Sequence, residues 1–146
     1  MANLIDNAMD VLVAKLVTEL VDGGSFKAVA RRVVNAFAEP AAPVLGLVPS
    51  AAVRTRKTAG RVVWEVTLAM AIVARSKDTD SDAAVSELLA DLDAALTAYN
   101  ALAAPKGVAD MPRWQFWYAH KHETLAPVGA VGTIRLRVDG ASLKVT

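Results

Sequence analysis

Residues 58–96, TAGRVVWEVTLAMAIVARSKDTDSDAAVSELLADLDAAL, join a long apolar run to an amphipathic segment through an acidic linker. Within residues 61–75 large apolar side chains alternate with small or polar ones, and this period of two predicts a β-strand. One face of the strand needs a core, whereas the mixed face could lie against another layer or a second subunit. The stretch holds no residue pattern typical of covalent chemistry.

The second half of this stretch predicts an amphipathic helix over residues 81–100. Apolar side chains recur at helical spacing from Val85 to Tyr99 and form one face. The linker SKDTDSD holds several residues able to cap the first turn, of which Asp80 or Ser81 fits best. We expect this helix to lie on a sheet.

Upstream, residues 3–21 predict another helix, because apolar side chains recur at helical spacing until Gly23 and Gly24 stop the pattern. Residues 26–37, FKAVARRVVNAF, fit both a helical stripe and a strand face, and their periodicity slightly favours the helix. Two prolines end this segment in either case.

The middle of the chain predicts further strand structure. Residues 44–48 are expected to form a short strand before Pro49. Valine and threonine then alternate with arginine over residues 53–56, and a turn or loop is expected over residues 57–60.

The C-terminal part predicts two paired strands. Residues 113–123, RWQFWYAHKHE, alternate in character, and a connection containing proline and glycine, LAPVGAVG, follows them. Gly129–Gly132 in this connection are expected to form a turn. Residues 133–140, TIRLRVDG, place Arg135 and Arg137 on an outward face and predict an antiparallel partner for the preceding strand.

The order of these elements predicts one α+β domain over residues 1–146, in which an antiparallel or mixed sheet is flanked by the N-terminal helix and the helix at 81–100. Hydrophobic residues make up 54% of the 146 residues, which leaves apolar surface for subunit contacts. The absence of cysteine excludes disulfides, thiol catalysis and cysteine-based zinc sites. Charges interrupt every long apolar run, so neither a signal peptide nor a transmembrane segment is expected.

The charges are unevenly distributed, although the net charge is only +1. Residues 26–61 hold seven basic groups and one acid, and residues 62–110 hold eight acids and three bases. Blocks of opposite sign suit head-to-tail association of identical subunits, unless the fold mixes them on one surface. Arg54, Arg56 and Lys57 are expected to form a basic loop that either contacts a phosphate backbone or acidic neighbour or is simply solvated.

No enzyme, cofactor or metal site is predicted. The chain lacks a Walker A loop, a dinucleotide-binding glycine motif, HExxH and a nucleophile elbow. His120 and His122 would share a strand face, but two imidazoles make an incomplete metal site. Asp78, Asp80 and Asp82 lack the glycine and glutamate of a calcium loop, so helix capping explains them better.

The strand at residues 113–121 allows two interpretations. Its basic residues Arg113 and Lys121 are interleaved with the aromatic residues Trp114, Phe116, Trp117 and Tyr118. Such a strand could stack the bases of single-stranded nucleic acid. The low net charge favours a strand whose aromatic side chains belong to the core.

The segment GRVVWEVTLAMAIVARSKDTDSDAAVSELLADLDAAL resembles the middle of bacteriophage tail terminator (tail completion) proteins and related neck proteins. In this family a long strand runs through a polar linker into an amphipathic helix packed on the sheet. The surrounding order is also similar, with an N-terminal helix, a basic region (FKAVARR, then VRTRK) and a late strand, TIRLRVDG. The aromatic stretch at 113–123 departs from the simplest form of the pattern.

The resemblance implies a structural virion protein at the junction of tail and head. Members of this family form a homo-oligomeric ring, commonly a hexamer, which caps the completed tail tube and offers a surface for head joining. The expected partners are further copies of the chain, the tail tube protein and the head-neck connector, with DNA passing through the lumen. It also implies a strand at residues 26–37. Arg54, Arg56 and Lys57 become candidates for ring or lumen contacts, and Arg113, Trp114, Trp117 and Lys121 for partner contacts.

Alternatives remain within and outside this class. A head-side neck adaptor or a tail-tube protein would share the same pattern. A single-stranded nucleic-acid-binding module that uses the strand at 113–121 is the alternative from another class.

Overall fold

The computed structural model describes residues 4–34, 43–58, 61–76, 81–102, 108–118 and 126–141. In chain order its elements are α1 (Leu4–Leu16), the π-helical turn η1 (Val17–Asp22), β1 (Ala28–Ala30), β2 (Val44–Thr58), β3 (Arg61–Ser76), α2 (Ser81–Asn100), β4 (Val108–Tyr118) and β5 (Ala126–Ala141).

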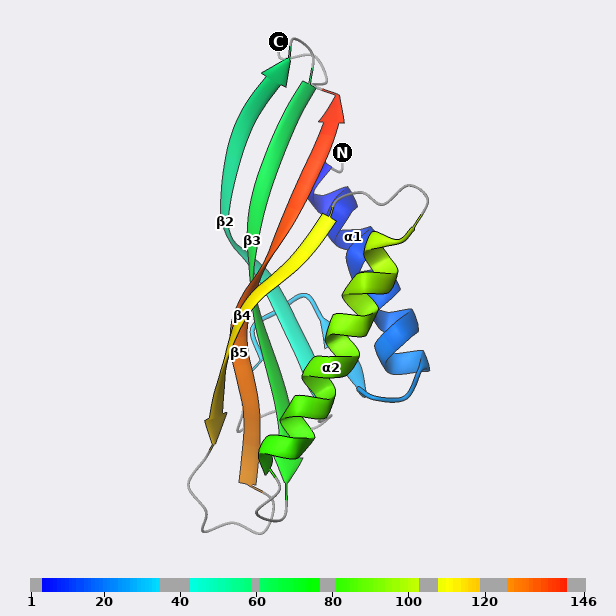
Figure 1. The fold of residues 1–146 in the computed structure, drawn as a ribbon, viewed down its shortest axis with the longest axis vertical. Coiled ribbons are helices and arrows are strands. Elements are labelled where there is room, and N and C mark those ends of the chain that lie inside the picture. The colour runs from blue at the N-terminus through cyan, green and yellow to red at the C-terminus, as the bar shows by residue number, and fades with distance from the viewer. Residues whose placement is uncertain are drawn as a thin grey trace.

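The five strands form one mixed sheet in the order β1-β2-β3-β5-β4. β1 runs parallel to β2, and every other neighbouring pair is antiparallel. The long strands twist strongly, and both helices lie on the same side of the sheet (Figure 1). The predicted α+β fold with a mixed sheet and two flanking helices is therefore confirmed.

The core lies between this sheet face and the helices. Its fully buried large side chains include Met9 and Leu12 from α1, Leu92 and Tyr99 from α2, and Leu45, Leu68, Ile72, Ile134 and Leu136 from the sheet. Burying a leucine or isoleucine stabilises the fold by about 1.5–3 kcal/mol relative to its exposure. The apolar faces expected on residues 61–75 and 81–100 are the ones that meet here.

Both predicted helices are present. α2 occupies the expected residues, and its buried positions repeat at helical spacing. α1 and η1 together cover residues 4–21 of the N-terminal prediction, whose first residue lies outside the described residues. The helical segment ends at Asp22, and Gly24 follows with a φ of 97°, in the left-handed region that glycine favours. The candidate cap Asp80 lies outside the described residues.

The helical interpretation of residues 26–37 is wrong for their described part. Ala28–Ala30 form the short strand β1, so the strand that the resemblance implies over residues 26–37 is present at only three of the described residues, and residues 35–37 lie outside the described residues. The Lys27 N–H donates to the Pro43 carbonyl at 2.8 Å, next to the β1–β2 pairing. Pairing with β2 therefore outweighs a weak helical periodicity.

The short strand expected at residues 44–48 and the basic loop expected at residues 54–57 are corrected to one long strand, β2, whose antiparallel partner is β3, and residues 59–60 lie outside the described residues. Arg54 and Arg56 are paired with Trp64 and Val62, so they belong to the strand. The register shifts at Ser50, whose hydroxyl donates to the Thr67 carbonyl at 3.1 Å. This bulge keeps the strand continuous past Pro49.

The turn expected at Gly129–Gly132 is wrong, because these residues lie inside β5 and pair with both β3 and β4. Gly132 is opposite Trp114, and a Cβ on Gly132 would approach the Trp114 Cδ2 atom to 2.8 Å. Glycine is present here because an aromatic ring lies over the backbone, and no turn is formed.

Candidate functional site

The described residues contain no group of three or more His, Cys, Asp or Glu side chains placed to hold a metal ion. His120 and His122 lie outside them, as do Asp78 and Asp80. Among the described helices none is long and apolar enough to cross a membrane. The features with functional potential are therefore surfaces, and two of them stand out.

The first surface is an arm formed by the ends of the central strands. Residues 51–58 of β2, with the paired parts of β3 and β5, extend beyond both helices along the long axis of the molecule (Figure 1). Arg54 lies on this arm and is exposed, and the register places it beside Trp64 on the helix side of the sheet. Arg56 lies two residues further along β2, and Lys57 lies at the register shift between Arg56 and Thr58. The three candidate ring contacts are thus neighbours on a projecting ribbon.

The second surface is the sheet face opposite the helices, which we call the bare face. In the described part of the chain both helices pack on the other side, and only the segment at residues 32–34 lies against the bare face. The register aligns two rows of side chains across it. One row contains Val48, Ala69, Thr133 and Arg113, and the next contains Gly46, Ala71, Val131 and Gln115.

Arginines and acids share the bare face. Arg113 on β4 and Arg135 and Arg137 on β5 are all exposed. The register places three acids on the same face: Glu65 of β3 is opposite Arg137, Asp110 of β4 is opposite Arg135, and Asp139 follows Arg137 on β5. The outward direction of Arg135 and Arg137 is as predicted, but only the β4–β5 register shows that Arg113 joins them.

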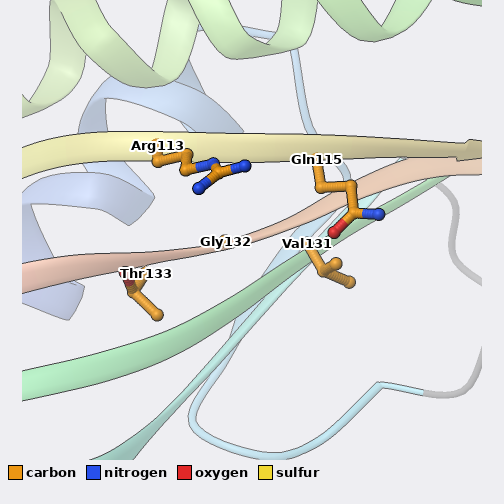
Figure 2. A pocket seen from close by; sticks show the side chains of 5 residues that line it. All are labelled: Arg113, Gln115, Val131, Gly132 and Thr133. Carbon is orange, nitrogen blue, oxygen red and sulfur yellow. The ribbon is translucent and has the colours of Figure 1, made fainter.

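A shallow hollow of about 450 Å³ lies beside these arginines. Figure 2 shows Arg113 and Gln115 on β4 next to Val131 and Thr133 on β5, with Gly132 between the latter two. A second hollow, of about 190 Å³, adjoins it through Val131 and Gly132. Arg32 and Val33 line this second hollow together with small residues of β2 and β3.

The aromatic side chains of β4 divide between the two sheet faces. Trp114 and Phe116 pack against the main core, and the buried Trp114 Nε1 has no hydrogen-bond partner among the described residues. Trp117 packs on the other side, in a small cluster with Val34, Val44 and Val73. Lys121 lies outside the described residues. The stacking hypothesis needs several rings on one exposed face, and the described rings are partly buried in two clusters.

Comparison with models of known protein families gives no match for the chain, and comparison with curated protein sequences gives none either.

Proposed function

We propose that the chain is a structural virion protein that assembles into a closed ring, caps a phage tail tube and offers a surface for head joining. The resemblance of residues 60–96 to tail terminator proteins motivates this function, and no enzymatic step or cofactor is part of it.

The single observation that best supports a ring is the two-sided construction of the subunit. Helices cover one face of the sheet, while the opposite face carries exposed arginines and valines. A ring of identical subunits needs two different complementary surfaces on each copy, because each contact is heterologous. A subunit with two unlike faces meets this requirement.

The projecting arm offers a further contact. A ribbon that extends past the helices can reach a neighbouring subunit or the tube end, and its arginine at position 54 can pair with acidic groups there (Figure 1). Arg56 and Lys57 lie on the same ribbon.

Sedimentation velocity over a range of protein concentrations tests this function. A closed ring predicts one oligomeric species whose size does not grow as concentration rises. Continued growth would contradict the ring and favour a tail-tube protein, which stacks without an end. A head-side neck adaptor would also form a closed species, and binding to purified tail tubes distinguishes it from a terminator.

The second candidate, a nucleic-acid-binding module, is favoured by one observation, the exposed arginines of the bare face. It predicts binding of single-stranded DNA that weakens steeply with salt. Absence of binding at low salt would exclude it.

A further inference from the structure

The bare face combines an apolar centre with a basic border. Val33 is 78% exposed and Val131 is 43% exposed, and both line the smaller hollow. Small residues of the central strands form the floor of this hollow, among them Ala69 and Ala71. Arg32 lies on its β2 side, and Arg113 lies on the β4 edge beyond Val131. A partner that fits here is smooth and apolar along its middle and acidic along its sides.

The outward side of α2 has this chemistry. Its exposed residues include Ala83, Ala90 and Ala94, which follow one another along one stripe of the helix. Glu87 and Asp91 are exposed toward one side of this stripe and Asp93 toward the other, and the helix contains no basic residue. At 1.5 Å per residue, the 20 residues of α2 make a rod about 30 Å long.

We infer that α2 of a second copy docks on the bare face of the first, with its alanine stripe over the apolar hollow and its acids toward the arginines. This inferred contact specifies one interface of the proposed ring, and it rests on the proposed function for the closure of that ring. The contact would turn a two-layer subunit into a helix–sheet–helix arrangement, which is a common way to cover a sheet. Because α2 and the bare face lie on opposite sides of the subunit, the same contact can repeat from copy to copy (Figure 1).

Two other occupants fit the surface less well. A bare face docked on its own copy through the hollow would bring Arg32 and Arg113 at its border toward their like-charged counterparts, which is unfavourable. A nucleic acid would satisfy the arginines, but its phosphate backbone would leave Val33 and Val131 without apolar contacts. The alanine stripe covers these valines, and the acids of α2 meet the arginines.

Cysteine crosslinking tests the contact directly, because the chain contains no cysteine of its own. Ala90→Cys lies on the α2 stripe and Thr133→Cys lies on the bare face, and both sites are exposed. Under mild oxidation the mixed proteins are expected to form a disulfide-linked dimer, whereas each variant alone is not. Ala14→Cys, an exposed site on α1, serves as the matched control and should not crosslink to Thr133→Cys.

Charge reversal adds a second readout. Arg113→Glu in the Thr133→Cys protein should lower the disulfide yield about two- to fivefold, as expected for one exposed ion pair. Asp91→Arg in the Ala90→Cys protein should restore part of the yield. An equal yield in all combinations would overturn the charge pairing on which the inference depends.

The outcomes separate this inference from the proposed function. Closed rings in which the mixed pair gives no disulfide would overturn the interface and leave the ring proposal standing. A specific disulfide in open-ended filaments would support the interface and contradict the ring. Binding of a labelled single-stranded oligonucleotide, without crosslinking above the Ala14→Cys control, would assign the bare face to nucleic acid and overturn the inference.

Discussion

Two glycines in the middle of β5 make room for two tryptophans of β4, one on each side of the sheet. Gly129 is opposite Trp117, and Gly132 is opposite Trp114. In both cases an added Cβ would come within 2.8 Å of a ring carbon, which is closer than carbon atoms pack. The glycines therefore allow the rings to lie close against β5.

Gly132→Ala should destabilise the fold by about 1–3 kcal/mol, because the added methyl group meets the Trp114 ring and the Arg113 backbone. Urea unfolding followed by tryptophan fluorescence measures this change as a lower midpoint. Thr133→Ala, the exposed neighbour, is the control and should change stability by less than about 0.5 kcal/mol. Equal midpoints for the two variants would show that the ring does not lie over Gly132.

Among the elements, α2 supplies Tyr99, the largest fully buried side chain of the described core. Leu92 and Tyr99 are fully buried, while Asp93 between them is exposed. The helix contacts β3, β4 and β5, so it covers the three adjacent strands on the β4 side of the sheet.

Leu92→Ala should lower the free energy of unfolding by about 2–5 kcal/mol, since it removes a fully buried side chain and leaves a cavity. Asp93→Ala is the control, and it should lie within about 0.5 kcal/mol of the wild type. Chemical denaturation followed by circular dichroism gives both values. A small effect of Leu92→Ala would mean that α2 is not packed on the sheet as described.

The elements with a strong hydrophobic period could be predicted from the sequence, and those determined by tertiary pairing could not. α2 has its predicted bounds, and β3 extends one residue beyond its prediction, because each needs only one apolar face. Gly129–Gly132 indicate a turn by composition, but the glycines instead accommodate rings from another strand. β1 is three residues long and depends on its pairing with β2, which no local pattern specifies.

The candidate surfaces were likewise predictable where they depend on the hydrophobic period, and not predictable where they depend on strand pairing. The alternation of residues 133–140 predicts that Arg135 and Arg137 point outward, and they do. Arg113 lies on the same face as Arg135 and Arg137 because of the β4–β5 register, which includes an irregularity between Asp110 and Arg113. The basic loop expected at residues 54–57 proves to be part of a strand, because a bulge carries β2 past Pro49.

At the scale of the whole molecule, the arm is expected to contribute to assembly and not to folding. The double variant Arg54→Glu and Arg56→Glu should reduce the oligomer fraction measured by sedimentation, while the monomer keeps its unfolding midpoint. Lys27→Glu, a charge reversal at an exposed site away from the arm, should leave assembly unchanged. Normal assembly of the double variant would remove the arm from the interface but would not contradict the ring.

Assembly should also depend on ionic strength. Raising salt from about 0.05 M to about 0.5 M screens exposed charge pairs, so the concentration needed for half-assembly should rise. Light scattering across this salt range measures the shift. If assembly strengthened with salt, apolar contacts would dominate the interface and the arginines would have no part in it.

Negative-stain electron microscopy of the purified protein over a range of concentrations would show whether this two-sided subunit closes into a ring, as we propose. We expect closed rings of uniform diameter with a central hole wide enough for duplex DNA. Open-ended tubes or filaments at every concentration would contradict the proposed ring.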